Sequence, residues 1–358
     1  MKILILTNHA PSLYNFRKEF INKLLEKNEI IVSMPEDQYF DYFENIGCKM
    51  IKTKLSRRSL NPLKDIQLIF HYYKIIKATN PDLIITYTIK PNIYGGVCAR
   101  LLKVRYASNI PGLGSTFYNT FLKALVIRMY RFALKQSEVV FFENIENKDF
   151  FINNKIIKSN QSVLLNGAGV NLSDYSPLPY PQEKKTNFLF IARIMKEKGI
   201  NELIEAAKML NKNGYVFELN ILGEFEENYI NKFNELSQNN WFKYHGYQKN
   251  IIPYIRDCHC FILPSWHEGM ANTNLESAAC ARPIITSNIH GCKEAVIDGV
   301  TGYLCEKQNF NNLYEVMKKF IELPLAEKQE MGIESRNHIE KKFDKNIVVK
   351  NTLEALKM

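Results

Sequence analysis

The sequence lacks a long apolar run. The N-terminal segment MKILILTN is too short for a signal peptide and is not followed by a small-residue cleavage site. The most hydrophobic stretch, FYNTFLKALVIRMYRFAL, is interrupted by Lys123, Arg128 and Arg131, whereas a membrane span needs about 20 mostly apolar residues. The seven cysteines are scattered and odd in number, which is typical of a reducing compartment. These features predict a cytoplasmic protein.

Other familiar signals are missing as well. The sequence shows no repeat of fixed period, no low-complexity tract and no glycine-rich phosphate motif of the GxGxxG or GxxxxGKS kind. Hydrophobic residues make up 46% of the chain and charged residues 23%, which are the values of an ordinary globular protein. A chain of 358 residues exceeds a typical single core and predicts two domains.

The net charge of +10 lies entirely in the first half of the chain. Residues 1–176 carry 24 Lys and Arg against 14 Asp and Glu, whereas residues 177–358 carry 23 of each. A basic half indicates an anionic partner, such as nucleic acid, an acidic membrane surface or a phosphorylated substrate. The alternative is charge that serves solubility alone.

Strands alternate with helices along the whole chain. Apolar runs predict strands, including KILILTN, PDLIITYT and TNFLFIAR, and segments with helical spacing lie between them. This alternation predicts an α/β fold with parallel sheets covered on both faces. The proline-rich stretch DYSPLPYPQEKK indicates a linker. We therefore predict Rossmann-like domains over residues 1–176 and 177–337, with a last helix at about 338–358 that returns to the first domain.

Ligands of such sheets bind outside the carboxyl ends of the strands. If the two sheets face each other across a cleft, the candidate site consists of the loops that follow their strands. These loops are residues 8–16, 86–92 and 109–115 in the first half, and 193–199, 223–227 and 264–276 in the second half.

The stretch HEGMANTNLE places Glu268 and Glu276 on either side of a predicted helix start. Thr273 to Glu276 fit a capping box, in which the glutamate reaches back to the first residue of the helix. Alternatively, the helix N-terminus offers its N–H groups to a phosphate, and the two carboxylates accept hydrogen bonds from hydroxyl groups nearby. A phosphate beside two sugars describes a nucleotide sugar.

Two cations, Arg193 and Lys198, follow the strand TNFLFIA at the same predicted edge. They suit a diphosphate, although solvated charges at a helix start are the alternative. The Cys258-His259-Cys260 triplet has too tight a spacing for a zinc site and is expected in a buried strand. His267 either orients Glu268 or faces solvent.

Several motifs in the second half occur together in one order. They are Asn166-Gly167, R-x4-K-G from Arg193 to Gly199, E-G-x6-E from Glu268 to Glu276, H-G-x2-E from His290 to Glu294, and D-G-x2-G from Asp298 to Gly302. With these motifs the chain resembles family-4 glycosyltransferases of the retaining GT-B kind. The segments SLYNFR, YTIKPNIYGG and NIPGLGSTF resemble the bacterial capsule, O-antigen and glycan-assembly members of that family.

The resemblance implies a role for each matching residue. Arg193 and Lys198 hold the diphosphate of the donor, Glu268 contacts the transferred sugar, and Glu276 holds the ribose. Glu268, Arg193 and Lys198 are the expected catalytic residues. Backbone at Gly269, Met270, Asn274 and Leu275 faces the sugar and the phosphates, and backbone near Gly246 holds the base. On the acceptor side the expected residues are Asn15, Arg17, Lys90, Gly112 and Gly114.

The resemblance also implies a reaction. The chain is expected to move a hexose or N-acetylhexosamine from a UDP-sugar to a lipid-linked or saccharide acceptor, with retention of configuration. Pro111 occupies the place where many relatives have a histidine, so electrostatic stabilisation replaces a general acid or base. The chain contains no D-x-D triplet, and neither an obligatory metal nor a cofactor is implied. The alternatives are a GT-B nucleotide-sugar epimerase or hydrolase, and a basic binding module without catalysis.

An anionic, lipid-diphosphate-linked acceptor would explain the basic first half. The candidate contacts are Arg17, Lys18, Arg57, Arg58, Lys90, Arg100, Lys103 and Arg105. Residues 117–135 mix aromatic, aliphatic and basic side chains, which suits either a peripheral contact with the inner face of the cell membrane or an amphipathic core helix. The sequence lacks a nucleic-acid recognition helix and a base-stacking platform, so nucleic acid is not expected as a partner.

Overall fold

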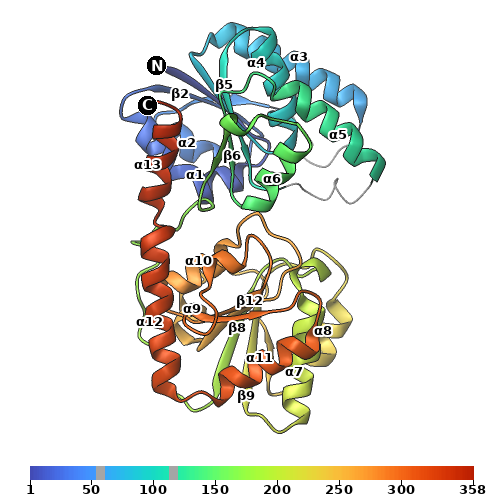
Figure 1. Ribbon diagram of the computed structural model, residues 1–358, viewed down its shortest axis with the longest axis vertical. Helices are drawn as coiled ribbons and strands as arrows, with labels where there is room; N and C mark the ends of the chain where they lie inside the picture. The colour runs from blue at the N-terminus through green and yellow to red at the C-terminus, as the bar shows by residue number, and fades with distance from the viewer. Residues whose placement is uncertain (54–60, 113–119) are drawn as a thin grey trace. The chain divides into compact units, whose positions relative to one another are not determined.

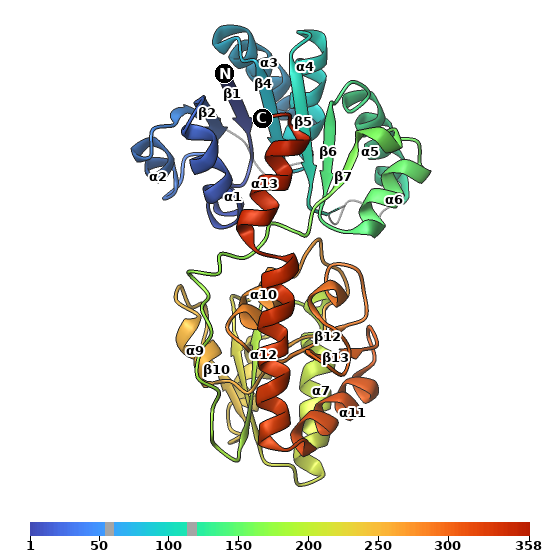
Figure 2. The ribbon, with the colours of Figure 1, turned by 60° about the vertical axis from the view of Figure 1, so that its left-hand side comes forward.

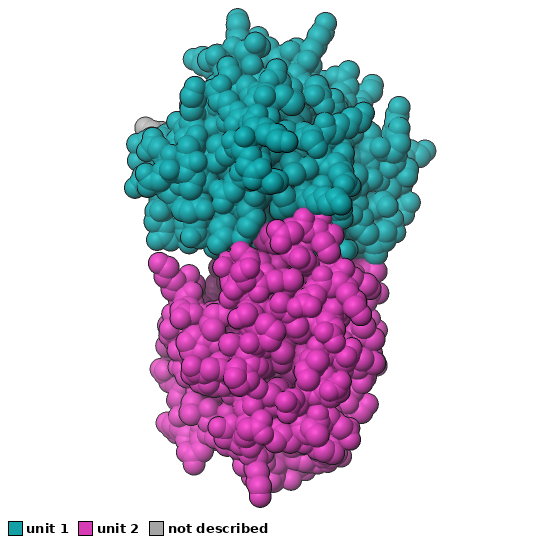
Figure 3. Space-filling view, turned by 90° about the vertical axis from the view of Figure 1, so that its left-hand side faces the viewer, with its two compact units in different colours: residues 1–168, 348–358 teal, residues 169–347 magenta. Residues whose placement is uncertain are grey.

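Two parallel β-sheets form the framework of the chain (Figure 1). The computed structural model describes residues 1–53, 61–112 and 120–358. The chain divides into two compact units, residues 1–168 with 348–358 and residues 169–347 (Figure 3). The boundary predicted from the sequence is 176/177, eight residues later. The predicted α/β class with two parallel sheets is confirmed.

The first unit contains a seven-stranded parallel sheet in the order β3-β2-β1-β4-β5-β6-β7. Its strands are β1 (Lys2–Leu6), β2 (Glu29–Met34), β3 (Lys49–Lys52), β4 (Leu83–Tyr87), β5 (Arg105–Ile110), β6 (Val139–Phe142) and β7 (Ser162–Leu164). The apolar runs KILIL and LIITY form the central pair β1–β4, because a central parallel strand is buried on both faces.

Helices cover both faces of this sheet (Figure 2). One face packs against α3 (Pro62–Thr79), α4 (Gly96–Leu101), α5 (Thr120–Ala133) and α6 (Ile145–Asn153). The other face packs against α1 (Ala10–Leu25), α2 (Phe40–Asn45) and α13 (Lys345–Ala355). A π-helical turn, η1 (Pro91–Gly95), leads into α4.

The second unit contains a six-stranded parallel sheet in the order β10-β9-β8-β11-β12-β13. Its strands are β8 (Thr186–Ile191), β9 (Phe217–Leu222), β10 (Phe242–Tyr244), β11 (Cys260–Leu263), β12 (Ile284–Ser287) and β13 (Gly302–Cys305). Its helices are α7 (Ile200–Lys212), α8 (Ile230–Leu236), α9 (Ile252–Asp257), α10 (Asn272–Ala279), α11 (Phe310–Glu322) and α12 (Leu325–Lys342).

The strand order of each sheet reverses once, between β1 and β4 and between β8 and β11. Loops that leave the carboxyl ends of such a pair diverge to opposite faces and leave a crevice for a ligand. In the second unit these loops are residues 192–199 after β8 and 264–271 after β11. The predicted donor residues therefore follow the switch point of the second sheet.

The predicted return of the last segment to the first unit is confirmed for residues 348–358. The single helix expected at about 338–358 is wrong, because the chain forms two helices there, α12 and α13. The break at Phe343 and Asp344 is held by Val170, whose N–H donates to the Phe343 carbonyl (2.8 Å) and whose carbonyl accepts from the Lys345 N–H (3.0 Å). The Asp344 carboxylate accepts from the Asn346 N–H at the start of α13. Val348 and Leu356 then join the core of the first unit.

The predicted proline-rich linker is also wrong, because this stretch packs onto the second unit. Arg282 is fully buried and donates to the carbonyls of Leu178 (3.2 Å) and Pro179 (2.7 Å). The Tyr180 hydroxyl donates to the His259 carbonyl (2.8 Å). A buried guanidinium needs several acceptors at once, and these backbone carbonyls satisfy it.

Among the helices that the structure describes, none combines the length and the apolar composition that crossing a bilayer requires.

Candidate active site

Two loops at the carboxyl edge of the second sheet are packed directly together. The Glu197 carbonyl accepts from the Trp266 N–H (2.8 Å) and from the Ser265 hydroxyl (3.1 Å). Gly199 ends the first loop with a φ of +73°, and a Cβ added there would lie 2.0 Å from the Pro264 carbonyl oxygen. The R-x4-K-G and E-G-x6-E motifs thus meet because a glycine allows the two backbones to touch.

This packing brings Lys198 and Glu268 together. The Lys198 Nζ lies 2.6 Å from the Glu268 Oε1, and the two side chains are only 17% and 12% exposed. A charge-assisted hydrogen bond of this length is strong where water has little access. The two residues that the sequence assigned to the diphosphate and to the sugar therefore form one fixed pair.

Arg193 lies on the same loop but is held differently. Its Nη1 is 3.4 Å from the Glu226 Oε2, and its side chain is about half exposed, at 51%. A long, solvent-exposed side chain reorients at small cost. Arg193 is therefore placed to turn toward an anion at this edge, whereas Lys198 is already fixed.

Helix α10 begins at Asn272, one residue before the predicted Thr273. The residue that precedes the helix is Ala271, which has no side chain that could cap the first N–H groups. The predicted capping box is therefore wrong. The glutamate of a capping box stands three residues after the N-cap, and that position after Ala271 is Asn274, not Glu276. An N-terminus without a side-chain cap leaves N–H groups to a ligand or to water.

The three apolar or amide residues predicted along this helix start are buried. Met270 and Leu275 are 6% and 0% exposed, and the Asn274 amide donates to the Thr286 hydroxyl (3.1 Å). Their side chains are therefore held in the interior, and a contact of their backbone with a ligand stays a prediction.

Glu276 faces Tyr175 and Lys345 rather than the start of the helix. Burial raises the pKa of the Glu276 carboxyl to about 7, although the charge of Lys345 and a hydrogen bond from Tyr175 act in the opposite direction. Burial likewise raises the pKa of Tyr175, and the neighbouring Glu276 adds to that effect. A carboxyl in this state changes its charge near neutral pH.

A third loop supports the first two. A Cβ at Gly291, whose φ is +89°, would lie 2.6 Å from the Glu268 carbonyl oxygen, and the Gly291 carbonyl accepts from the Ala271 N–H (2.7 Å). Glu294 holds this loop, accepting from the Gly291 N–H (2.7 Å) and bonding the His290 Nδ1 (2.8 Å). The H-G-x2-E motif is thus a support for the E-G-x6-E loop.

The remaining motif glycines shape turns. Gly302 lies against β12, where a Cβ would be 1.9 Å from the Ile284 carbonyl oxygen. Gly246 has a φ of +67°, and its carbonyl accepts from the Gly223 N–H (2.9 Å) after β9. Gly246 is therefore at the same edge as the 193–199 loop. Gly167, in the N-G motif, has a φ of +63°.

The expected acceptor-side residues of the first unit lie in different surroundings. Asn15 is exposed on α1, and Gly112 follows β5, with no atom of the described residues within 4 Å of its Cβ position. Arg17 is instead buried, with its Nη2 2.6 Å from the Glu143 Oε1. Lys90 pairs with Asp65 at 2.6 Å. Gly114, Arg57 and Arg58 lie outside the described residues.

The Cys258-His259-Cys260 triplet is buried at the start of β11, as expected. The His259 Nδ1 accepts from the Asn187 N–H (3.1 Å), and the Nε2 lies 3.1 Å from the Glu183 carbonyl oxygen. His267 is exposed, next to Glu268.

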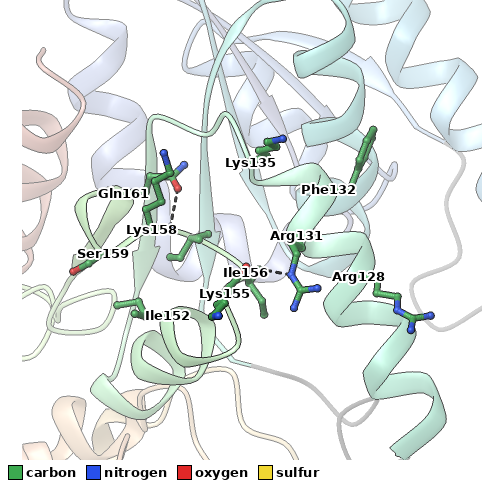
Figure 4. A pocket seen from close by; sticks show the side chains of 11 residues that line it. Arg128, Arg131, Phe132, Lys135, Ile152, Lys155, Ile156, Lys158, Ser159 and Gln161 are labelled. Carbon is green, nitrogen blue, oxygen red and sulfur yellow. Dashed lines mark hydrogen bonds between the residues drawn. The ribbon is translucent and has the colours of Figure 1, made fainter.

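A pocket of about 700 Å³ lies away from these edges, in the first unit (Figure 4). It lies between the last turns of α5 and the segment that joins α6 to β7, beyond the ends at which β6 and β7 begin. The predicted donor residues do not line it.

Three partners of the site residues were missed from the sequence, namely Tyr175 and Lys345 at Glu276 and Glu226 at Arg193. Tyr175 and Lys345 lie about 100 and 70 residues from Glu276 along the chain. No local pattern connects such distant positions.

We expect Gly199→Ala to destabilise the protein by several kcal/mol, since its Cβ would clash with the Pro264 carbonyl. Gly214→Ala is the matched control, because Gly214 has a similar φ of +79° but open space around it. That variant should lose only about 1 kcal/mol, from left-handed backbone strain alone. Urea unfolding followed by circular dichroism measures both; equal losses would show that the loop contact is unimportant.

We also expect the stability of the wild type to depend on the charge of Glu276. Because burial raises its folded-state pKa above the unfolded value, the protonated form favours folding, and this contribution is lost as the pH rises from about 4.5 to about 7. Glu276→Gln should remove this loss, which we expect to be on the order of 2 kcal/mol. Unfolding free energies measured at pH 5 and pH 8 test this; an unchanged difference between the two pH values would contradict it.

Comparisons with known proteins identify the family of the chain. A family profile described as "Glycosyl transferases group 1" matches residues 179–340, and one described as "Glycosyl transferase 4-like" matches residues 2–144. The chain is 30% identical, over 90% of both chains, to the N,N'-diacetylbacillosaminyl-diphospho-undecaprenol alpha-1,3-N-acetylgalactosaminyltransferase of Campylobacter jejuni. It is 25% identical to the UDP-Gal:alpha-D-GlcNAc-diphosphoundecaprenol alpha-1,3-galactosyltransferase of Escherichia coli, over 73% of this chain and 71% of that protein.

Solved structures show the same fold. Anabaena HepE, crystallised with UDP and glucose, superposes with a TM-score of 0.82 at 16% identity, covering 100% of this chain and 99% of that one. This similarity shows the fold alone. The two family profiles and the relative at 30% identity show the family. The chain belongs to family 4 of the glycosyltransferases and is an enzyme of the GT-B fold that transfers sugars.

Proposed function

We propose that this enzyme transfers an N-acetylhexosamine from a UDP-sugar to a saccharide carried on a lipid diphosphate, in the assembly of a bacterial surface glycan. The observation that carries the proposal is the shielded Lys198–Glu268 pair, 2.6 Å apart, in which Glu268 lies on the loop that leads to the uncapped start of α10. The relatives named for undecaprenol-diphosphate acceptors support the lipid carrier.

The donor site of the proposal follows from the edge of the second sheet. Lys198 and Arg193 bind the diphosphate, together with the backbone N–H groups at the start of α10. Glu268 accepts hydrogen bonds from the sugar, and Lys198 fixes the direction of its carboxylate. Glu276 accepts from the ribose hydroxyls, and the turn at Gly246 borders the base.

The proposed reaction retains the configuration at the sugar carbon. The bond between the sugar C1 and the diphosphate oxygen breaks, and negative charge grows on the leaving group. Lys198, Arg193 and the start of α10 stabilise that charge in the transition state. The acceptor oxygen bonds to C1 from the same face, and its proton passes to the leaving phosphate. No metal or cofactor is required in this scheme.

The acceptor belongs to the first unit in this proposal. Its sugar and diphosphate meet residues near Asn15 and Gly112, at the carboxyl edge of the first sheet. The buried Arg17 holds Glu143 and shapes this edge rather than binding the acceptor itself. Because such a lipid lies in a bilayer, the enzyme works at an anionic membrane surface.

Removing the fixed cation should slow the reaction. We expect Lys198→Ala to lower kcat by a factor of about 10² to 10³, because the lysine that is removed stabilises the leaving diphosphate. Arg193→Ala should lower kcat strongly for the same reason. Glu268→Gln should lower kcat about 10²-fold while the fold is kept. UDP release from UDP-N-acetylgalactosamine, with an undecaprenyl-diphosphate-linked sugar as acceptor, is the measurement.

Lys208→Ala is the control, since Lys208 is a half-exposed lysine of α7 that pairs with Glu205, at 3.2 Å. Its kcat should stay at the wild-type value. A Lys198→Ala enzyme that keeps at least half of the wild-type kcat would contradict the proposed role. Product formed equally fast without any acceptor would favour the epimerase or hydrolase alternative.

A further inference from the structure

Helix α3 has a second apolar face that points away from the sheet. Leu68, Tyr72, Ile75 and Ile76 are its buried residues. A different set, at positions i, i+3, i+7 and i+10, is exposed: Leu63 (71%), Ile66 (50%), Phe70 (63%) and Tyr73 (37%). At 3.6 residues per turn these four side chains form one stripe on the side of the helix opposite to its core face.

The neighbouring helices add to this surface. Helices α3, α4 and α5 lie next to one another over the same face of the first sheet (Figure 1). Leu101 of α4 is 62% exposed, and Leu125 and Phe132 of α5 are 48% and 52% exposed. The outer side of this layer, from here on the outer α3–α5 surface, therefore presents large apolar side chains on three adjacent helices. Large apolar side chains gathered in this way mark an interaction surface.

The charged residues of the same three helices are almost all positive. Together they contain seven Lys and Arg and a single acidic residue, Asp65, which pairs with Lys90. Lys64, Lys74 and Lys77 are exposed on α3 beside the apolar stripe. By contrast Arg17 and Arg105, also in the first unit, are paired with Glu143 and Glu138. The positive excess of the first half is thus concentrated where the apolar side chains are.

The pocket at the end of α5 extends this charge. Five of its lining residues are basic and none is acidic: Arg128, Arg131, Lys135, Lys155 and Lys158 (Figure 4). Arg131 donates to the carbonyls of Asn154 (2.8 Å) and Lys155 (3.1 Å) and so joins α5 to the segment that follows α6. Phe132, three isoleucines and the polar residues Ser159 and Gln161 complete the lining. Such a pocket suits an anionic group attached to an apolar one.

We propose that the outer α3–α5 surface docks on an anionic phospholipid bilayer, with the apolar stripe of α3 entering the headgroup region. Apolar side chains flanked by lysines on one exposed helix face are the pattern of helices that lie in a membrane interface. Phosphate groups of the lipids pair with the lysines and with the basic pocket. A protein partner fits less well, because lysine is depleted at protein–protein interfaces.

The membrane contact considered from the sequence was residues 117–135, of which 117–119 lie outside the described residues. The apolar stripe lies on α3, and α5 contributes Leu125, Phe132 and its arginines. The proposal rests on the proposed function for the acceptor in a bilayer. Its test measures membrane binding and needs no sugar transfer.

A fluorophore placed on the stripe tests the insertion directly. All seven native cysteines are buried, so a thiol-reactive, polarity-sensitive dye goes selectively to the new thiol of Phe70→Cys. Its emission should shift to the blue and rise about twofold when vesicles containing phosphatidylglycerol are added. Val216→Cys is the control, at an exposed apolar residue of the second unit that is 70% exposed, and its emission should not change.

Paired substitutions by glutamate test the surface as a whole. Ile66→Glu with Phe70→Glu should lower the vesicle-bound fraction, as a partition coefficient, about tenfold, and Lys74→Glu with Lys77→Glu should do the same. The control pair Val216→Glu with Ile230→Glu has similar exposures, 70% and 53%, on the second unit and should bind as the wild type does. Raising the salt concentration should weaken binding, and phosphatidylcholine vesicles should bind less.

Two outcomes would overturn the inference. One is vesicle binding that is equal in the α3 variants and the control pair. The other is a wild-type dimer that the α3 variants convert to monomer without any vesicle binding, since a second copy would then cover the surface. If the wild type binds vesicles through α3 but shows no sugar transfer, the proposed function fails and this inference stands.

Discussion

The proposed donor edge of the second unit depends on one backbone contact, that of Gly199 with the Pro264 carbonyl. It allows the loop after β8 to lie on the loop after β11, and the Glu197 carbonyl then binds both Ser265 and Trp266. The Lys198–Glu268 pair is a consequence of this packing. Motifs that are distant in the sequence therefore form one packed unit. In this unit Gly291 and Glu294 support the loop that carries Glu268.

The charge of the first unit has two distinct uses. Arg17, Lys90 and Arg105 are held in ion pairs with acidic residues and shape the fold. The cations of α3, α4 and α5 have almost no acidic neighbours on their own helices and are interspersed with exposed apolar side chains. A composition that looks merely basic thus separates, in three dimensions, into structural pairs and a surface that attracts anions. An enzyme with an acceptor in a bilayer gains from such a surface, because it confines diffusion to the membrane.

Much of the fold could be predicted from the sequence, and the reasons for the misses are physical. Central strands such as β1 and β4 are continuous apolar runs because both faces are buried. The short strands β3, β7 and β10 lack that pattern, since they lie at or near sheet edges and are partly exposed. The candidate site residues were predicted from motif spacing and from the family resemblance. The surroundings of Glu276 were not, because Tyr175 and Lys345 approach it only through tertiary packing, and the buried Arg282 similarly converts an apparent linker into part of the second unit.

The central claim is that the Lys198–Glu268 edge is the donor site, and hydrogen–deuterium exchange of the intact enzyme with UDP-N-acetylgalactosamine tests it most directly. Bound donor should protect backbone amides in residues 193–199 and 264–276, with weaker protection in the supporting loop 288–294. Free N-acetylgalactosamine serves as the control and should leave exchange unchanged. Donor binding that protects other segments while these three stay unprotected would contradict the account.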